Sequence, residues 1–377
     1  MILAGMVTVV GCGSQSLDQA RKIALADWQK STAALRYKDA SSDLEYGHVE
    51  KAFEKALQAY QMDPNNIQFA VLYCKTLIEK CEYKKAQTEL EYQIDRNPKN
   101  YELNYYLGVA YEKLGKHEAA AAALHRALTI QPGSNDAICA YAEALFLAGK
   151  PRQALAFLER KIVNYDPNRA CYEIYGRIAL RCKMYEKSIA SFERACSMAP
   201  KKSYYLELLI EANYAAGKYD SVVGLYQRIL EEKNYTPTAT ILIQVGDSYF
   251  ANESFTLAEK LYQKVVKADE TNIDAFVRLA KVSIATRKYV SAFENAENAI
   301  NIDPSNIEAV KVLAITYMTQ RQYKNVVKLL GKHARKQNCD EIYLMLGQAY
   351  AKLGESRKSQ ACLKKARTLN PSLAIAK

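Results

Sequence analysis

The sequence contains few residues that break helices. Its 377 residues include 15 glycines and 9 prolines, the two residue types that are least favourable inside a helix. No linker rich in proline, glycine or serine and no low-complexity stretch divides the chain. No apolar run approaches the roughly 18 residues of a membrane-spanning helix. These absences argue against domains joined by flexible linkers and against a transmembrane helix, and they favour an almost wholly helical chain.

Residues in catalytic or metal-binding arrangements are also scarce. There are 4 histidines, and none stands at a metal-ligand or nucleophile spacing from Cys, Asp or Glu. No glycine loop of the phosphate-binding kind is present, and the 9 cysteines include no CxxC pair. We therefore predict that the protein is not an enzyme and has no catalytic residue, no cofactor and no metal site.

Positive charge is concentrated at the C-terminal end. The formal net charge is +11, and residues 321–377 carry 13 Lys and Arg against 3 Asp and Glu, a net of +10. The first 320 residues are therefore close to neutral. Such an end favours an acidic partner, namely a lipid headgroup layer, a polyanion or an acidic protein face. A solvated end kept soluble by lysines explains it equally well, and no nucleic-acid reading motif accompanies the charge.

One segment shows a regular spacing of large and small residues. With Pro132 counted as position 32 of a unit, nine residues fall at positions 4, 7, 8, 11, 15, 20, 24, 27 and 32: Asn104, Leu107, Gly108, Tyr111, Gly115, Ala120, Leu124, Ala127 and Pro132. This order resembles the 34-residue consensus of the tetratricopeptide repeat (TPR) superfamily. Positions 4 to 11 form one stripe of a first helix and positions 20 to 27 one stripe of a second. Small residues at positions 8 and 20 let the helices approach closely, Gly115 suits the turn, and Pro132 ends the second helix.

The same period continues along the chain. Position 20 carries Ala52, Ala86, Ala120, Ala154, Ser188, Val222, Ala258, Ala292, Val326 and Ser359. The resemblance covers roughly residues 33–371. It implies an all-α fold, a right-handed superhelical solenoid of about ten antiparallel helix hairpins.

The less regular segments predict the limits of this solenoid. Residues 16–38, which include Trp28, predict a long helix that caps the N-terminal end, within an anchor-and-cap segment 12–38. Two extra residues near Thr236-Pro237 predict a pitch change at 234–238. Residues 372–377 form a tail too short for the usual polar capping helix. We therefore expect a partner or a second copy to cover the last hairpin; the alternatives are that the sequence is truncated there or that its last helix is polar enough to stand alone.

The first residues resemble a bacterial lipoprotein signal peptide. Residues 1–10 read MILAGMVTVV and are followed by Gly11 and Cys12. The resemblance implies that residues 1–11 are removed and that Cys12 carries a lipid anchor. In a two-membrane bacterium it implies the periplasmic face of the outer membrane. No Lys or Arg precedes the apolar stretch, which departs from the family, so an accidental match in a cytoplasmic protein stays open.

The TPR resemblance also implies a ligand surface. In this family the first helices line a concave face, and positions 2, 5, 9 and 12 point into it. In the central repeats these positions combine carboxylates with an apolar stripe: Glu143, Phe146, Glu173, Arg177, Leu180, Glu207, Glu211, Tyr214, Asp247 and Phe250. We expect this groove to bind a peptide that carries Lys or Arg and large apolar residues. Packing of position 12 between helices, with solvated acids, is the alternative.

Cysteine positions suggest one disulfide. Cys171 and Cys196 occupy positions 3 and 28 of one repeat, which face each other across an antiparallel hairpin. In an oxidising compartment they could bond. As small apolar residues, cysteines also simply fill cores.

Three functions remain open from the sequence. The first is a non-catalytic protein-interaction scaffold, similar to the lipid-anchored TPR lipoproteins of the bacterial envelope that assist assembly of pili, secretion pores or the cell-wall machinery. The second is a soluble cytoplasmic adaptor or regulator. A polyanion binder that acts through the basic C-terminal repeats is a third, with nucleic acid disfavoured.

Overall fold

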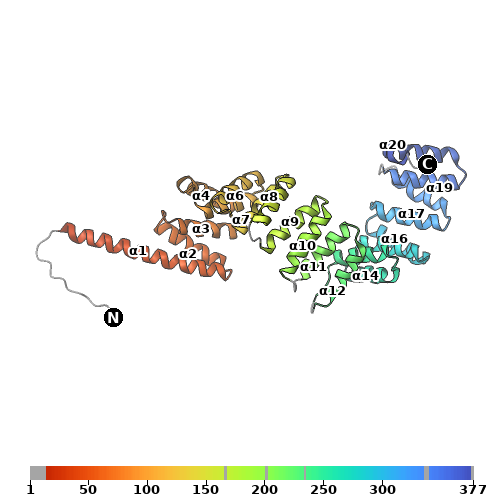
Figure 1. The fold of residues 1–377 in the computed structure, drawn as a ribbon. Coiled ribbons are helices and arrows are strands. Elements are labelled where there is room, and N and C mark those ends of the chain that lie inside the picture. Colours follow the sequence, from red (N-terminus) through yellow and green to blue (C-terminus); the bar gives the residue numbers. More distant parts are fainter. Residues whose placement is uncertain (1–13, 165–167, 200–202, 233–234, 335–338, 375–377) are drawn as a thin grey trace. The chain divides into compact units, whose positions relative to one another are not determined.

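A computed structural model describes residues 14–164, 168–199, 203–232, 235–334 and 339–374 (Figure 1). Throughout these ranges the regular structure is helical, with twenty α-helices, one short 3-10 helix and no strand. The chain forms two compact units, Met1–Met184 and Tyr185–Lys377. The boundary lies between α9 and α10. A pitch change at 234–238 stays a prediction, since residues 233 and 234 lie outside the described ranges.

The N-terminal unit is a series of antiparallel hairpins in which each helix packs on the next. Its helices are α1 (Ser14–Glu45), α2 (Val49–Met62), α3 (Ile67–Glu79), α4 (Tyr83–Arg96), α5 (Tyr101–Lys113), α6 (His117–Ile130), α7 (Asn135–Leu147), α8 (Pro151–Asn164) and α9 (Arg169–Arg181). First helices also contact the first helix of the next repeat, as α3 contacts α5 and α7 contacts α9. The all-α hairpin fold predicted from the sequence is confirmed.

The C-terminal unit repeats this arrangement. Its helices are α10 (Tyr185–Ser197), α11 (Ser203–Ala215), α12 (Tyr219–Leu230), α13 (Ala239–Ala251), α14 (Phe255–Ala268), α15 (Ile273–Ala285), α16 (Tyr289–Ile302), α17 (Ile307–Thr319), α18 (Tyr323–Ala334), α19 (Asp340–Lys352) and α20 (Ser356–Leu369), followed by the 3-10 helix η1 (Pro371–Ala374). No helix in the described ranges of either unit is long and apolar enough to cross a membrane.

Small residues hold the hairpins together, as the spacing predicts. All ten residues at position 20 are buried, and eight of the ten, from Ala52 to Val326, belong to the apolar core. At position 8, a Cβ added to Gly108 would lie 2.4 Å from Cγ of Leu124. The two helices of this hairpin therefore pack too closely to accept even a methyl group there.

Hydrogen bonds at the helix starts reinforce the repeat. Seven first helices begin after a polar residue whose side-chain oxygen accepts a backbone N–H two or three residues further on: Asn66, Asn100, Ser134, Asn168, Thr238, Asn272 and Asn306. Each such cap satisfies a donor that the helix itself leaves unpaired.

The predicted N-terminal helix is present and is longer than expected. α1 runs from Ser14 to Glu45, and its last part packs on α2 and α3 through the buried Ala33 and Ala40. Residues 19–31 are all exposed, and Trp28 is 61% exposed. Only the C-terminal part of α1 therefore caps the stack, while the part with Trp28 extends beyond it (Figure 1).

Candidate protein-binding surface

We number each repeat from the first residue of its first helix, so that α3, α5 and α7 begin at position 1 with Ile67, Tyr101 and Asn135. The inner face is the surface formed by positions 2, 5, 9 and 12 of the first helices. It is described separately in the two units.

The inner face of the N-terminal unit contains a pocket of about 460 Å³. Three first helices, α1, α3 and α5, line it. Its walls include Tyr37 and Leu44 of α1, Gln68, Val71, Leu72, Lys75 and Glu79 of α3, and Glu102 and Tyr106 of α5. Gln68, Val71 and Lys75 stand at positions 2, 5 and 9, so the pocket opens on the inner face.

The pocket combines apolar walls with charges of both signs. Lys75 is half-buried in it, while Glu79 and Glu102 are exposed at its edge. Burial, and then the nearby Glu102, raise the pKa of Tyr106 to about 12. The phenol is therefore protonated at neutral pH and can donate a hydrogen bond. This lining can hold an apolar side chain and pair with charged neighbours on either side of it.

Of the residues predicted to bind a ligand, five lie on α7 and α9 in the N-terminal unit. Glu143, Glu173 and Leu180 are half-buried, and Arg177 is exposed with its Nη1 4.0 Å from Glu173 Oε1. Phe146, at position 12, packs against the core between the repeats.

Glu143 lies near a second carboxylate of this face. Burial, and then Glu143, raise the pKa of Glu112 on α5 above its ordinary value. Two carboxylates thus lie near each other on this face, whereas Phe146 packs against the core.

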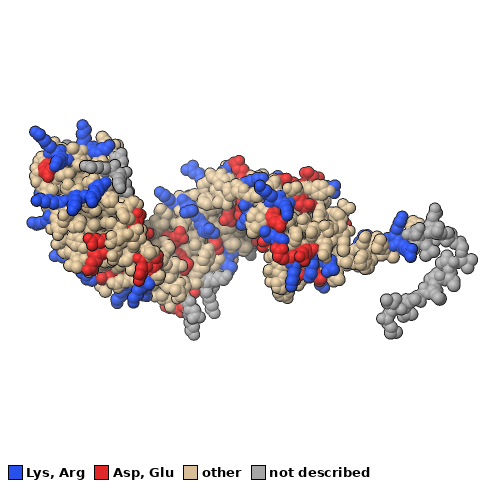
Figure 2. Space-filling model, turned by 180° about the vertical axis from the view of Figure 1, so that it is seen from behind, with Lys and Arg blue, Asp and Glu red and all other residues tan. Residues whose placement is uncertain are grey.

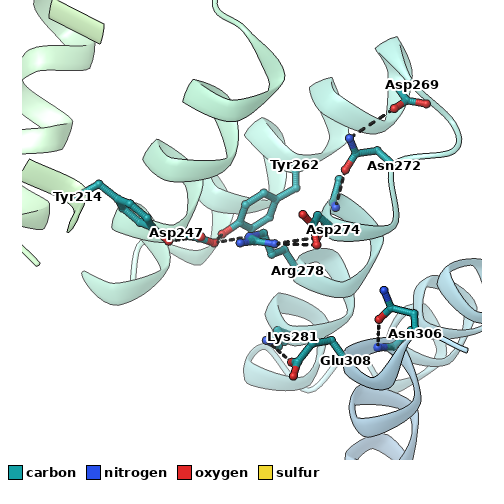
Figure 3. Close-up of polar contacts among 12 residues, drawn as sticks. Tyr214, Asp247, Tyr262, Asp269, Asn272, Asp274, Arg278, Lys281, Asn306 and Glu308 are labelled. Carbon is teal, nitrogen blue, oxygen red and sulfur yellow. Dashed lines mark hydrogen bonds and ion pairs between the residues drawn. The ribbon is translucent and has the colours of Figure 1, made fainter. Parts of the chain in front are cut away.

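The other five predicted residues lie on α11 and α13 in the C-terminal unit. Asp247 is enclosed by donors (Figure 3). Its Oδ1 accepts from Tyr262 Oη at 2.7 Å and from Arg278 Nε at 2.8 Å, and its Oδ2 accepts from Tyr214 Oη at 2.7 Å. Burial, and then the bond to Asp247, raise the pKa of Tyr214 to about 12. Two predicted ligand-binding residues, Tyr214 and Asp247, thus bind each other across adjacent repeats.

The remaining three predicted residues differ in whether their side chains are free to contact a ligand. Glu207 accepts a hydrogen bond from Tyr235 Oη at 2.6 Å. Phe250 packs on Phe255 with ring centroids 5.3 Å apart and contacts the core around Tyr262. Glu211 is exposed. In this unit, Glu211 is the predicted carboxylate best placed to meet a ligand.

The N-terminal pocket was missed from the sequence. The acidic pattern at positions 5 and 9 belongs to the central repeats, whereas Lys75 is a cation at position 9 of an earlier repeat. Reading all four inner positions of the repeat that begins at Ile67 would have identified it.

Positive side chains gather on the last repeats of the C-terminal unit (Figure 2). Exposed cations of α18 and α20 include Lys324, Lys328, Lys332, Arg357, Lys364, Lys365 and Arg367. No large apolar side chain of α19 or α20 is exposed within the described residues. The exposed surface of α20 is therefore polar, and coverage of this end by a partner or a second copy stays a prediction.

The two cysteines predicted to pair belong to different units, Cys171 to the first and Cys196 to the second. Both are free cysteines in the structure, so this pairing stays a prediction. Cys12 and the proposed signal segment 1–11 lie outside the described residues. Within the described ranges, no group of three or more His, Cys, Asp or Glu side chains is arranged to hold a metal.

Family profiles match three parts of the chain. Profiles described as tetratricopeptide repeat match residues 77–135 and 340–373. A profile described as subunit 3 of the anaphase-promoting complex, or cyclosome, matches residues 123–195.

Relatives of similar organisation occur in distant organisms. The chain is 22% identical to the TPR repeat-containing protein YpiA of Bacillus subtilis, over 92% of this chain and 81% of that protein. It is 22% identical to a tetratricopeptide repeat protein 21 homolog of Caenorhabditis briggsae over 92% of this chain but 28% of that protein.

A solved structure shows the same fold. The C-terminal part of a TPR repeat-containing protein from Cytophaga hutchinsonii aligns with a TM-score of 0.53 at 18% identity, over 64% of this chain and 99% of that one. TPR proteins are generally protein-interaction scaffolds without catalytic activity. Two parts of the chain thus match tetratricopeptide repeat profiles, and most of its length is similar at low identity to TPR repeat-containing proteins.

Proposed function

We propose that the protein is a non-catalytic scaffold that binds a segment of a partner protein on its inner face, with the pocket between α1, α3 and α5 as the anchor point. The pocket is the observation that carries this proposal. It opens at the positions that the repeat uses for ligands, and it is lined from three successive first helices. An interface concentrates its binding energy where a large side chain fills such a site.

The lining suggests what the partner segment carries. A large apolar side chain fits against Leu44 and Leu72, and an acidic neighbour pairs with Lys75. Basic residues further along the segment face Glu143, a half-buried carboxylate on the inner face of the same unit. In the C-terminal unit, the exposed Glu211 offers a separate contact for a basic residue. Such opposed charges set the register and the association rate more than the affinity.

Charge reversal in the pocket tests the proposal. Partners captured from cell extract by the wild-type protein are compared with those captured by Lys75→Glu and by Lys51→Glu, which places the same change on the exposed surface of α2. We expect at least one partner to be lost with Lys75→Glu and kept with Lys51→Glu. Circular dichroism of both variants confirms the fold. Capture that is the same for all three proteins contradicts the anchor role of the pocket.

Glu211→Lys tests the acidic part of the inner face. Since Asp247 and Glu207 already accept internal hydrogen bonds, Glu211 gives the clearest result. Glu193→Lys, an exposed change on α10 of the same unit, is the matched control. Loss of capture with Glu211→Lys alone supports a basic ligand, and equal capture argues against it.

A polyanion is the second candidate ligand, and the exposed cations of α18 and α20 favour it. We expect binding to heparin or to anionic vesicles to weaken as salt rises. Binding should also fall with Lys364→Glu/Lys365→Glu. Lys260→Glu/Lys264→Glu on α14 changes the same charge at exposed positions and should have less effect. An equal loss of binding in the two double variants would indicate that binding depends on net charge alone.

We also propose a location in the bacterial envelope, with Cys12 as the lipid anchor and assembly of a multiprotein machine as the role. Support comes from the order of apolar residues before Gly11-Cys12. Metabolic labelling with a palmitate analogue, with and without Cys12→Ala, tests it. Label that depends on Cys12 is expected, and its absence favours the cytoplasmic adaptor.

A further inference from the structure

Two buried thiols meet where α7 packs on α9 in the N-terminal unit. Cys139 of α7 is 8% exposed and Cys171 of α9 is 1% exposed. Their sulfur atoms lie 3.0 Å apart, and both are free cysteines. A disulfide bond is about 2.05 Å long, so the sulfurs need to approach by about 1 Å to bond. The two side chains already point at each other, and the helices that carry them are in contact.

The surroundings give the two sulfurs different roles. Cys171 lies in the first turn of α9, and Asn168 caps that turn by accepting the Cys171 N–H at 3.1 Å. The positive end of a helix stabilises a thiolate. The thiol–thiol contact, in which either sulfur can donate, lowers the pKa of Cys171 and raises the pKa of Cys139. Together with its place at the start of α9, this makes Cys171 the better nucleophile.

We propose that Cys139 and Cys171 form a reversible oxidation site, which hydrogen peroxide converts into a disulfide that joins α7 to α9. The Cys171 thiolate attacks the nearer peroxide oxygen, the O–O bond breaks, and the departing hydroxide takes a proton to become water. Cys171 is then a sulfenic acid. The Cys139 sulfur attacks it, the S–S bond forms, and hydroxide leaves with the Cys139 proton as a second water. Two electrons pass from the two sulfurs to the peroxide.

The geometry selects both the oxidant and the pair. With Cys139 8% exposed and Cys171 1% exposed, a small peroxide reaches the sulfurs more readily than a bulky disulfide does. Cys74 in the same unit is 0% exposed, and Cys182 is half-buried at the far end of α9. Within the described residues, neither Cys74 nor Cys182 has a second sulfur within hydrogen-bond distance, unlike the Cys139–Cys171 pair.

The bond would act on the inner face. Cys139 stands at position 5 of its repeat, one helical turn before Glu143, and Cys171 is two residues before Glu173. A covalent link between α7 and α9 fixes the spacing of these two first helices beside the predicted ligand residues. This site is independent of the pocket, and it would exist whether or not a partner binds there.

Mass spectrometry of the intact protein tests the proposal. Reduced protein is exposed to hydrogen peroxide, free thiols are alkylated under denaturing conditions, and the digest is searched for linked peptides. We expect a link between the Cys139 and Cys171 peptides that dithiothreitol reverses. A link between Cys171 and Cys196, free thiols throughout, or Cys171 oxidised to a sulfinic acid without any link would each overturn the proposal.

A variant separates the two roles. In Cys139→Ser the sulfenic acid on Cys171 has no partner, so we expect dimedone to trap it. Cys182→Ser, a change at the residue that follows α9, should leave the Cys139–Cys171 link intact. Failure of dimedone to label Cys171 in Cys139→Ser, with labelling elsewhere, would contradict the assignment of Cys171 as the nucleophile.

Discussion

The close approach of α13 and α14 allows a strong test of the packing argument. Gly246 stands at position 8 of its repeat, facing Tyr262 on α14. A Cβ added to Gly246 would lie 2.5 Å from Cε1 and 2.9 Å from Cζ of that ring. Carbon atoms pack best at about 3.5–4.0 Å, so the ring in Gly246→Ala would have to move by about 1 Å. Tyr262 is 1% exposed, and its hydroxyl bonds to Asp247 at 2.7 Å, so it has little freedom to move.

Three effects decide the size of the change. Overpacking a core costs about 1–3 kcal/mol. A hydrogen bond to a charged group contributes about 1.5–3 kcal/mol, part of which is lost when the ring shifts away from Asp247. Alanine is favoured over glycine inside a helix by about 1 kcal/mol, which offsets part of the cost. We therefore expect Gly246→Ala to lower the free energy of unfolding by about 2 kcal/mol.

Gly224→Ala on α12 is the matched control. It makes the same change inside a helix of the same unit, and a Cβ there would meet no atom within 4 Å. We expect it to raise stability by about 0.5–1 kcal/mol. Urea denaturation followed by circular dichroism gives both values, and the slopes are compared because repeat stacks can unfold in segments. The reasoning is refuted if Gly246→Ala proves as stabilising as Gly224→Ala.

Three further predictions concern turns, caps and pH. Gly217 has a φ of +73° with no atom near its missing Cβ, so Gly217→Ala should cost about 1–2 kcal/mol in thermal or urea unfolding through backbone conformation alone. Asn306 caps α17 by accepting the Ala309 N–H at 3.0 Å, and Asn306→Ala should cost about 1 kcal/mol, against no change for an exposed surface alanine substitution. Burial and Glu143 raise the pKa of Glu112, so its ionisation opposes folding above that pKa. Glu112→Gln should therefore raise the free energy of unfolding at pH 7. This gain in stability should vanish below about pH 4.5 in unfolding curves measured across pH. A gain that persists at low pH would show that charge is not the cause.

The hairpin architecture could be predicted because it depends on residues that repeat. Ala120 and Gly108 stand where two helices touch, and only small side chains fit there. A short period of large and small residues therefore encodes the packing of each hairpin. The two-unit division could not be predicted this way, since α9 and α10 lie on either side of it without any loss of the repeat pattern.

The turn between the two helices of a hairpin has the same backbone conformation in repeats that carry different residues there. The predicted role of Gly115 is confirmed, with φ at +72°. The same position holds Cys81, Lys183, Glu253, Arg287 and Arg321 in other repeats, and all have φ between 57° and 60°. L-residues adopt this conformation at a cost of about 1–2 kcal/mol. The packing of the two flanking helices imposes the turn, so the turn forms even where the sequence has no glycine to predict it.

The inner face shows why charge at a ligand position does not by itself identify a ligand site. Glu211 and Asp247 both occupy position 9, yet Glu211 is exposed and Asp247 is bonded to Arg278 and two tyrosines. The arginine comes from position 6 of the following repeat, where the repeat after Glu211 has Gln244 instead. Whether a carboxylate at position 9 is exposed or hydrogen-bonded thus depends on the residue at position 6 of the next repeat, 31 to 33 places further along the chain. Comparing each position with its neighbour in the next repeat separates exposed carboxylates from those that hold adjacent repeats together, and by that criterion Glu211 is a better candidate for ligand binding than Asp247.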